Sequence, residues 1–221
     1  MKALVTGGCG FIGSHLCRKL IEKGFIVEIV DDMSSGTLDS LAGLNIRVTF
    51  SDFVNEFFNS VSEKRDAVVI QGDFASPQIL QRIESGEYDY VFHQAAIPRV
   101  LYSVENPGIT TSVNVLGTVR LLEACRGNVK RVILASSSSV YGGADILPTS
   151  ENYPKAPQSP YAWQKSATED IAKIFSDLYN LDVVCLRYFN VFGPGQLGDS
   201  PYSTAIAAWC HAIKEGSDHR T

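Results

Sequence analysis

The most informative absences in this sequence are those of cysteine pairs, long apolar runs and clusters of positive charge. The five cysteines of the 221-residue chain are scattered and form no Cys-x-x-Cys pair, so neither a disulfide framework nor a metal site is expected. No apolar run approaches the roughly eighteen residues that a membrane-spanning helix needs, and the N-terminus lacks the layout of a signal peptide. We therefore expect a cytoplasmic protein with no membrane partner.

Positive charge is sparse and dispersed along the chain. The net charge is −5 and no stretch concentrates lysine or arginine, so a nucleic-acid partner is not expected. Apolar residues make up 45% of the chain and charged residues 19%, which is typical of an ordinary globular protein. Any site for an anionic ligand must therefore be local.

Short apolar runs alternate with helical segments along most of the chain. This alternation is typical of a parallel sheet that is covered by helices on both faces. We therefore predict an α/β fold with a Rossmann-type, doubly wound parallel sheet. The expected strands are Ala3–Thr6, Ile26–Val30, Ala67–Gln71, Tyr90–His93, Val132–Ala135 and Val183–Leu186. The expected helices are Phe11–Glu22, Thr110–Arg126 and Pro160–Tyr179, with an extra helix considered at Asp52–Ser62 in a less regular region.

The stretch "VTGGCGFIGS" lies between the first expected strand and the first expected helix. Gly7, Gly10 and Gly13 have the spacing of a dinucleotide-binding turn, in which backbone N–H groups and a helix N-terminus face a pyrophosphate. Taken alone, the same spacing also fits a simple tight turn. Asp31 ends the next expected strand, where a carboxylate would bind ribose hydroxyls and repel a 2′-phosphate. Together these residues favour NAD over NADP.

A second stretch, "SPYAWQKS", places Tyr161 and Lys165 four residues apart on one face of an expected helix. A phenol is a poor base at neutral pH, but a nearby ammonium and a cationic nicotinamide both favour the phenolate, so we expect Lys165 and bound NAD together to favour ionised Tyr161. The serines 136–139 follow a strand at the end where open α/β sheets bind ligands, and one hydroxyl there would bind the reacting oxygen. Taken alone, Tyr161 and Lys165 also fit an exposed pair on a helix face, and the serines also fit a polar strand end.

The order of the motifs along the chain resembles that of the extended short-chain dehydrogenases/reductases, in particular their sugar-nucleotide 4-epimerase branch. The motifs are "TGGCGFIGSH", "DDMSSG", "QGDF", "VFHQAA", "NVLGTVRLLEAC", "SSSSVYG", "SPYAWQKS" and "LRYFNVFGPGQ". The resemblance implies that NAD is bound by a set of residues spread over these motifs. They are Gly7, Gly10, Phe11, Ile12, Gly13, Asp31, Asp32, Ser35, Gly36, Asp73, Phe74, Gln94, Ala95, Ala96, Tyr161, Lys165 and Tyr188.

The same resemblance assigns the chemistry to Ser137, Tyr161 and Lys165. It implies that a UDP-sugar, a UDP-hexose or a UDP-N-acetylhexosamine, is oxidised at C4 to a transient 4-keto sugar and reduced again on its other face, which inverts C4. The residues implied in placing this substrate are Ser137, Ser138, Asn114 and Asn190.

One departure from related enzymes bears on the reaction. The related 4,6-dehydratases carry an Asp-Glu pair directly after the active-site serine or threonine, whereas this chain has Ser138 and Ser139. We therefore expect epimerisation rather than loss of water. Another dehydrogenase, reductase or dehydratase of nucleotide sugars remains the nearest alternative, and a non-catalytic NAD-binding protein is the alternative from another class.

The resemblance also implies a domain organisation. Residues 1–190 would form the NAD-binding domain with the catalytic residues, and residues 191–221 would begin a substrate-binding lobe of which most is absent from this chain. The helices Thr110–Arg126 and Tyr161–Tyr179 resemble those that pair across a two-fold axis in the family. We therefore expect a homodimer.

Overall fold

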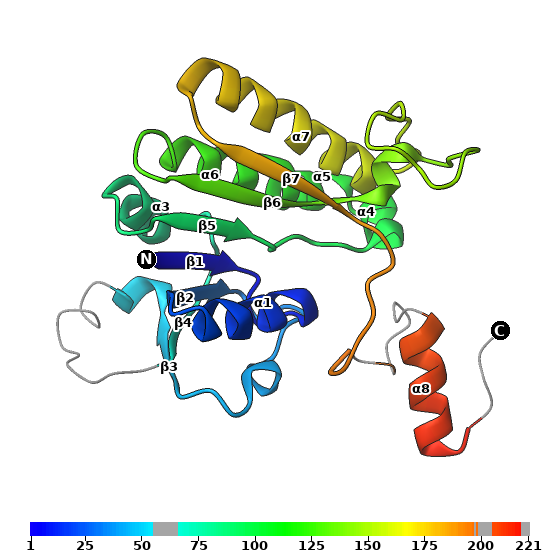
Figure 1. Cartoon of the computed structure of the whole chain (residues 1–221), viewed down its shortest axis with the longest axis horizontal. Coiled ribbons are helices and arrows are strands. Elements are labelled where there is room, and N and C mark those ends of the chain that lie inside the picture. The colour runs from blue at the N-terminus through cyan, green and yellow to red at the C-terminus, as the bar shows by residue number, and fades with distance from the viewer. Residues whose placement is uncertain (55–65, 197, 199–204, 218–221) are drawn as a thin grey trace. The chain divides into compact units, whose positions relative to one another are not determined.

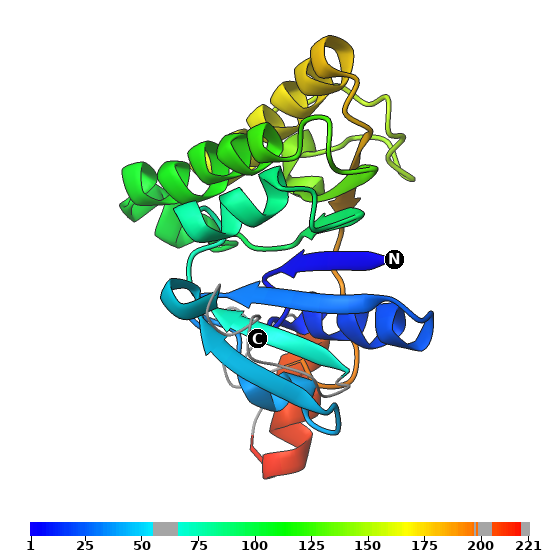
Figure 2. The same cartoon turned by 90° about the vertical axis from the view of Figure 1, so that its left-hand side faces the viewer.

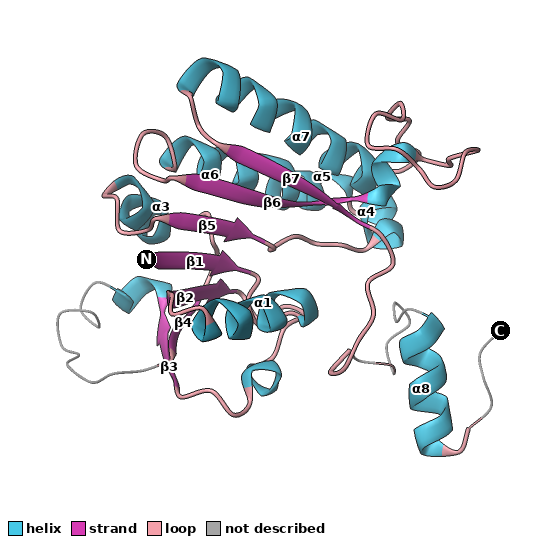
Figure 3. Cartoon of the chain, in the orientation of Figure 1, coloured by secondary structure: helices cyan, strands magenta, loops and turns pink. Residues whose placement is uncertain are grey.

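The computed structural model describes residues 1–54, 66–196, 198 and 205–217, and its centre is a seven-stranded sheet (Figures 1 and 3). The strands lie in the order β3-β4-β2-β1-β5-β6-β7, and the five strand pairs from β3 to β6 are parallel. Their bounds are β1 Lys2–Thr6, β2 Ile26–Asp31, β3 Ile46–Phe50, β4 Ala67–Gln71, β5 Tyr90–His93, β6 Arg131–Ser137 and β7 Val183–Tyr188. The predicted Rossmann-type fold is confirmed.

Helices cover both faces of this sheet, with α1 on one face and α3, α6 and α7 on the other (Figure 2). Their bounds are α1 Phe11–Glu22, α3 Pro77–Glu84, α4 Val100–Glu105, α5 Pro107–Thr111, α6 Thr118–Ala124, α7 Pro160–Tyr179 and α8 Ala205–Glu215. A π-helical turn, η3 (Ser112–Gly117), joins α5 to α6, and short 3-10 turns form η1 (Leu38–Leu41), η2 (Ser51–Phe53) and η4 (Ser138–Tyr141). Among the described helices, none is long and apolar enough to cross a membrane.

The alternation of side chains along the strands divides the core into two halves. In β1, Leu4 packs on the side of α3, α6 and α7, whereas Ala3 and Val5 pack on the side of α1. All three side chains are buried, as expected for a central strand with helices on both faces. The near-continuous apolar sequence of these strands is therefore a consequence of two-sided burial.

The six expected strands are confirmed, and their observed ends differ from the predicted ones by at most two residues. The expected helices at Phe11–Glu22 and Pro160–Tyr179 have the predicted bounds, and α5, η3 and α6 together form the helix expected at Thr110–Arg126. The strand β3 and the helices α3 and α4 were not among the expected elements. The extra helix considered at Asp52–Ser62 falls largely on residues 55–65, which lie outside the described residues.

The chain divides into two compact units, Met1–Arg187 and Tyr188–Thr221. The first unit contains the sheet up to Arg187 and all the helices before α8. Its boundary lies three residues before the predicted domain boundary at residue 190. The assignment of the second unit to a substrate-binding lobe stays a prediction.

A buried charge network holds the amino-terminal edge of the sheet together. The Glu28 carboxylate, on β2, accepts hydrogen bonds from Arg82 of α3 at 2.7 Å and from the Tyr88 hydroxyl at 2.7 Å. Its other oxygen lies 2.6 Å from the ammonium of Lys2 on β1. Glu28 and Arg82 are both buried, and Arg82 also lies 2.8 Å from the carboxylate of Glu87, so the charges of this network compensate one another. One carboxylate thus links β1, β2, α3 and the start of β5.

Replacement of Glu28 by Ala should lower the free energy of unfolding by about 3 kcal/mol, because Arg82 would remain buried without its closest anion. Chemical denaturation measures this change. Replacing Glu28 and Arg82 together by Met should cost less than the single substitution. Glu22→Gln, which breaks an exposed pair with Lys19, is the control and should leave the unfolding midpoint unchanged. Equal stability of Glu28→Ala and the wild type would contradict the proposed role of Glu28.

Candidate functional site

The predicted site residues of the first unit gather at the carboxyl edge of the sheet. Because the paired strands are parallel, the residues that follow β1, β2, β4, β5 and β6 all emerge there. The strand order reverses between β1 and β5, and the ends of these two strands, Thr6 and His93, are paired. The backbone N–H of Ala95, after β5, donates to the Thr6 hydroxyl at 3.3 Å. Gln94 and Ala95 therefore lie beside the glycine turn, where a Cβ on Gly7 would meet the backbone of both, and Ala96 follows them.

Two glycines of this turn are required by the packing of the protein itself. Gly7 has a φ of +70°, and a Cβ there would lie 2.7 Å from the backbone nitrogen of Ala95. A Cβ on Gly13 would lie 2.1 Å from the carbonyl oxygen of Gly7. Gly7 therefore lets the turn pass close to β5, and Gly13 lets α1 pack against the turn.

Gly10 differs from these two glycines. It is the N-cap of α1, and no side chain caps this helix end. Within the described part of the chain, a Cβ on Gly10 would meet a single atom inside 4 Å, the Gly7 carbonyl oxygen at 3.3 Å. The first backbone N–H groups of an α-helix, here from Phe11 and Ile12, have no acceptor within the helix, and the space beside Gly10 is open. This cradle fits the pyrophosphate of a dinucleotide.

The Asp31 carboxylate stabilises the glycine turn by hydrogen bonds. Its two carboxylate oxygens accept the backbone N–H groups of Cys9 and Met33, each at 2.9 Å. Burial raises the pKa of this carboxyl group, and the two hydrogen bonds oppose that effect. Each oxygen keeps a further lone pair that could accept a ribose hydroxyl. Asp31 therefore supports the turn in addition to the ribose contact predicted for it.

The loop after β2 carries the other predicted residues of the "DDMSSG" motif. Asp32 and Ser35 are exposed, and the Asp32 carboxylate accepts the backbone N–H of Ser34 at 2.9 Å. Gly36 is buried against the glycine turn, where a Cβ would lie 2.7 Å from the carbonyl carbon of Cys9. This loop therefore lies beside the turn, as the predicted cofactor site requires.

The two predicted residues of the "QGDF" motif differ in burial. Asp73 is exposed, and its side chain accepts the backbone N–H of Ala75 at 2.9 Å. Phe74 is buried, with its ring 4.7 Å from the ring of His93, so its side chain belongs to the core. Tyr188 and Asn190 belong to the second unit, and their predicted roles stay predictions.

The structure brings Ser137, Tyr161 and Lys165 together. Ser137 ends β6, and its hydroxyl hydrogen-bonds Tyr161 in the first turn of α7. Lys165 lies one turn further along α7, with its nitrogen 5.9 Å from the centre of the Tyr161 ring. That nitrogen donates to the carbonyl oxygen of Ala135 at 2.7 Å. The three predicted catalytic side chains therefore form one cluster at the carboxyl edge.

In the chain without a bound ligand, the phenolate of Tyr161 is not favoured. Burial raises the pKa of Tyr161, and the hydrogen bond to Ser137 only partly opposes this effect. Burial also lowers the pKa of Lys165 to about 8. Tyr161 and Lys165 are both more than nine-tenths buried, so loss of solvation is the largest influence on both pKa values. A phenolate here needs a further source of positive charge.

Three residues that support this cluster were not predicted. Ser103 of α4 accepts the backbone N–H of Tyr161 at 3.1 Å. Ser139 donates to Ser137. Glu169 lies two turns after Tyr161 on α7 and accepts the Ser136 hydroxyl at 2.5 Å. The i, i+4, i+8 spacing of Tyr161, Lys165 and Glu169 was a usable signal, whereas nothing in the sequence indicates the contact of Ser103.

Asn114, predicted to bind substrate, lies in a buried polar network. Its side-chain nitrogen donates to Gln164 of α7 at 2.8 Å and to the Ile97 carbonyl at 3.1 Å. Its oxygen accepts the backbone N–H of Ile97 at 2.8 Å. Both N–H donors are thus used within the protein, and the amide ties the loop after β5 to α7. Its contact with substrate stays a prediction.

His93 lies in the same network and is uncharged. Burial, and then the charge of Lys165, lower its pKa to about 3. The Thr118 hydroxyl donates to the Asn114 carbonyl at 2.7 Å and lies 2.9 Å from Nε2 of His93, so Nε2 carries the proton. Nδ1 then accepts from the Thr6 hydroxyl at 2.7 Å. His93 is therefore a buried, hydrogen-bonded residue that joins β1, β5 and α6.

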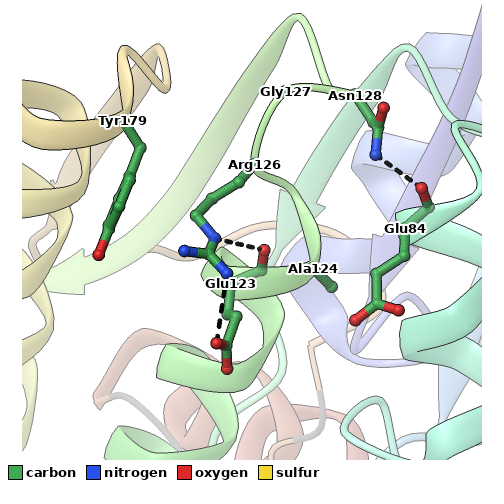
Figure 4. Close-up of a pocket in the computed structure, with 7 residues that line it drawn as sticks. All are labelled: Glu84, Glu123, Ala124, Arg126, Gly127, Asn128 and Tyr179. Atoms are coloured by element: carbon green, nitrogen blue, oxygen red, sulfur yellow. Dashed lines mark hydrogen bonds and ion pairs between the residues drawn. The ribbon is translucent and has the colours of Figure 1, made fainter.

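A shallow pocket of about 540 Å³ lies at the opposite edge of the sheet, near the carboxyl ends of α3, α6 and α7 (Figure 4). Asn128 donates to the Glu84 carbonyl at 2.6 Å, and Arg126 lies 4.8 Å from the centre of the Tyr179 ring. None of its lining residues was predicted to have a function. In the described ranges, no group of three or more His, Cys, Asp and Glu side chains could hold a metal ion.

Comparison with known proteins identifies the family. The sequence pattern of the NAD-dependent epimerase/dehydratase family matches residues 3–220. The UDP-glucose 4-epimerase of Mycolicibacterium smegmatis is 36% identical over 220 residues, which cover 98% of this chain and 64% of that protein. The chain thus spans less than two thirds of the length of this relative.

Solved structures agree with this result. A UDP-N-acetylglucosamine 4-epimerase from Methanobrevibacter ruminantium, solved with UDP-N-acetylmuramic acid, has a TM-score of 0.83 at 36% identity and covers 98% of this chain and 64% of its own. A UDP-glucose 4-epimerase from Thermus thermophilus, solved with NAD, has a TM-score of 0.77 at 30% identity and covers the same shares. The chain belongs to the NAD-dependent epimerase/dehydratase family.

Proposed function

We propose that this protein binds NAD and epimerises a UDP-hexose or a UDP-N-acetylhexosamine at C4. The observation that carries the proposal is the cluster of Ser137, Tyr161 and Lys165 beside a turn that fits a pyrophosphate. A hydroxyl, a buried phenol and a buried ammonium at one sheet edge can move a proton to and from an alcohol. The UDP-sugar is inferred from the relatives, whose names include UDP-glucose and UDP-N-acetylglucosamine 4-epimerases.

NAD fits the residues at the carboxyl edge. The start of α1 would hold the pyrophosphate, Asp31 would accept the hydroxyls of the adenosine ribose, and the exposed Asp73 would meet the adenine. When bound, NAD supplies reversible acceptance of a hydride from C4 of the sugar, which leaves a 4-keto sugar. Its cationic ring would also supply the positive charge that Tyr161 lacks in the chain alone.

The chain's own residues move and hold the proton of the reacting alcohol. Tyr161, ionised, accepts the proton of the sugar 4-hydroxyl as that O–H bond breaks, and it returns a proton when the alcohol forms again. Ser137 donates a hydrogen bond that stabilises the phenolate. Lys165 is held by Ala135, at a position from which its ammonium can bind a ribose hydroxyl and favour the phenolate.

Ser138 and Asn190 are the residues that we propose as further contacts of the substrate. Ser138 and Ser139 follow Ser137 and carry no carboxyl group, so the site lacks an acid and base for loss of water at these two positions. This feature favours epimerisation over dehydration. A net dehydrogenase or reductase would instead release reduced cofactor.

We also propose that the protein is a homodimer. Apolar side chains are exposed along α7 and along the helical segment formed by α5 and η3, and they are Trp163, Ile174 and Leu178 on α7 with Ile109 and Leu116 on the other segment. Exposed apolar stripes of this kind mark interaction surfaces. Pairing of two copies through these helices would bury both stripes in a four-helix contact.

A cytoplasmic location completes the proposal. All five cysteines are free, and Cys9, Cys17 and Cys125 are buried. Free thiols fit a reducing compartment.

The purified protein should bind NAD, and Asp31→Ala should weaken binding by about 1–3 kcal/mol, because the ribose and the glycine turn both lose a charged acceptor. Titration calorimetry measures the affinity. Asp39→Ala, an exposed carboxylate on η1, is the control and should bind NAD as the wild type does. Absence of NAD binding by the wild-type protein would sink the cofactor assignment.

Sedimentation of the protein at micromolar concentration should show a dimer. Leu116→Glu or Trp163→Glu should give a monomer, because a charge would be buried in the apolar contact. Ile26→Glu alters an exposed residue at the start of β2 and should leave the dimer intact. A wild-type monomer would remove this part of the proposal.

Replacement of Tyr161 by Phe should lower 4-epimerase activity on UDP-sugars about 10²–10⁴-fold, because the ring remains but the ionisable oxygen is lost. NAD binding, measured in parallel, should remain. Monitoring of free NADH separates epimerisation from net redox chemistry. If Tyr161→Phe kept most of the activity, the proposed mechanism would be wrong.

A further inference from the structure

The serine that binds Tyr161 is itself bound twice by one neighbour. Ser137 Oγ accepts the hydroxyl of Ser139 at 2.9 Å and the backbone N–H of Ser139 at 3.2 Å. The N–H contact is built into the fold, because Ser137 is the N-cap of η4. A serine hydroxyl has two lone pairs and one proton. With both lone pairs occupied, Ser137 can only donate to any further partner.

That further partner is Tyr161. The Ser137 hydroxyl hydrogen-bonds the phenol, which lies more than nine-tenths buried at the start of α7. Two charged groups lie on the same helix face: Lys165 donates to Ala135, and Glu169 accepts the hydroxyl of Ser136. Ser103 of α4 contacts Tyr161 through the backbone N–H of that residue. Ser137 is thus the side chain placed to donate to the phenolate oxygen from the protein side.

We propose that Ser139 is a positioning residue, which directs the proton of Ser137 toward Tyr161 and so stabilises the ionised form of that tyrosine. Hydrogen bonds in series polarise one another, so two donors on Ser137 Oγ make its own proton a better donor. The inference rests on the proposed function, since it concerns how the base of the reaction ionises. It assigns a role to a residue outside the three predicted catalytic ones.

A consequence for proton transfer follows from the lone pairs of Ser137. A relay through Ser137 would require its oxygen to accept the proton of the sugar 4-hydroxyl, and that oxygen is already saturated by Ser139. The proton therefore passes directly from the 4-hydroxyl to the Tyr161 oxygen, as one O–H bond breaks and the other forms. Ser137 keeps its own proton throughout.

The ionisation of Tyr161 can be followed without substrate or cofactor. Protein labelled with 3-fluorotyrosine, whose phenol ionises at lower pH than tyrosine, is titrated by ¹⁹F NMR. The resonance of residue 161 is the one that disappears in Tyr161→Phe. We expect Ser139→Ala to raise the pKa of this phenol by about 0.5–1 unit, the loss of one ordinary hydrogen bond. Ser139→Thr keeps the hydroxyl and should restore the wild-type pKa.

Two comparisons separate positioning from a structural effect. In the Ser137→Ala background, Ser139→Ala should cause no further shift, because Ser139 acts through Ser137. Ser176→Ala, on the exposed side of α7, should not change the wild-type pKa. An unshifted pKa in Ser139→Ala, or a full shift in the Ser137→Ala background, would overturn the inference. If Ser139→Ala does not fold, Ser139→Cys, a weaker donor of similar size, should give a smaller shift of the same sign.

Kinetics give the second readout. The kcat of Ser139→Ala should fall about three- to tenfold, and the limb of its pH profile that reports the base should move to higher pH. Ser139→Thr should recover both. If the pKa of Tyr161 shifts in Ser139→Ala but the wild-type protein has no epimerase activity, the role of Ser139 is supported and the proposed reaction is rejected. Failure of the inference and failure of the proposed function are therefore distinguishable.

Discussion

The register of α7 against β6 is the constraint on which the rest of the site depends. Three side chains at intervals of four residues on one face of α7 bind three consecutive residues of the strand. Tyr161 meets Ser137, Lys165 donates to the Ala135 carbonyl, and Glu169 accepts the Ser136 hydroxyl. Ser137 is the last residue of β6 and the N-cap of η4, so its hydroxyl meets the phenol where the strand ends. The contacts of Lys165 and Glu169 thus fix where the reacting groups meet.

The carboxylate of Glu169 extends this constraint to β7. Arg187 binds both of its oxygens, at 2.8 and 2.7 Å, and also donates to the Tyr141 hydroxyl and the Glu151 carbonyl, each at 2.8 Å. Burial would raise the pKa of Glu169, but the hydrogen bonds from Arg187 and Ser136 lower it below its usual value. The group therefore stays ionised at neutral pH and joins α7, β6, β7 and the loop after η4.

Sequence patterns predicted the parts of the molecule that local chemistry determines. The helix Phe11–Glu22 has a glycine turn before it and apolar periodicity within it, and its bounds were predicted correctly. The edge strand β3 was missed because Thr49 is its one fully buried residue, which gives no apolar run. The raised pKa of Tyr161 in the chain without ligand was not anticipated, because the sequence shows a nearby lysine but not the burial of both groups. The bond from Tyr161 to Ser103 joins residues 58 positions apart and has no periodic signature.

The unequal burial of the cysteines has a practical consequence for labelling. Burial raises the pKa of Cys9 to about 12 and that of Cys185 to about 11, so thiolate is scarce there at neutral pH. Cys17 and Cys125 are buried and their pKa values are also raised by burial. Cys210, on α8, is the exposed thiol among the five. A maleimide dye would therefore attach to the second unit of the unmodified chain and leave the first unit unlabelled.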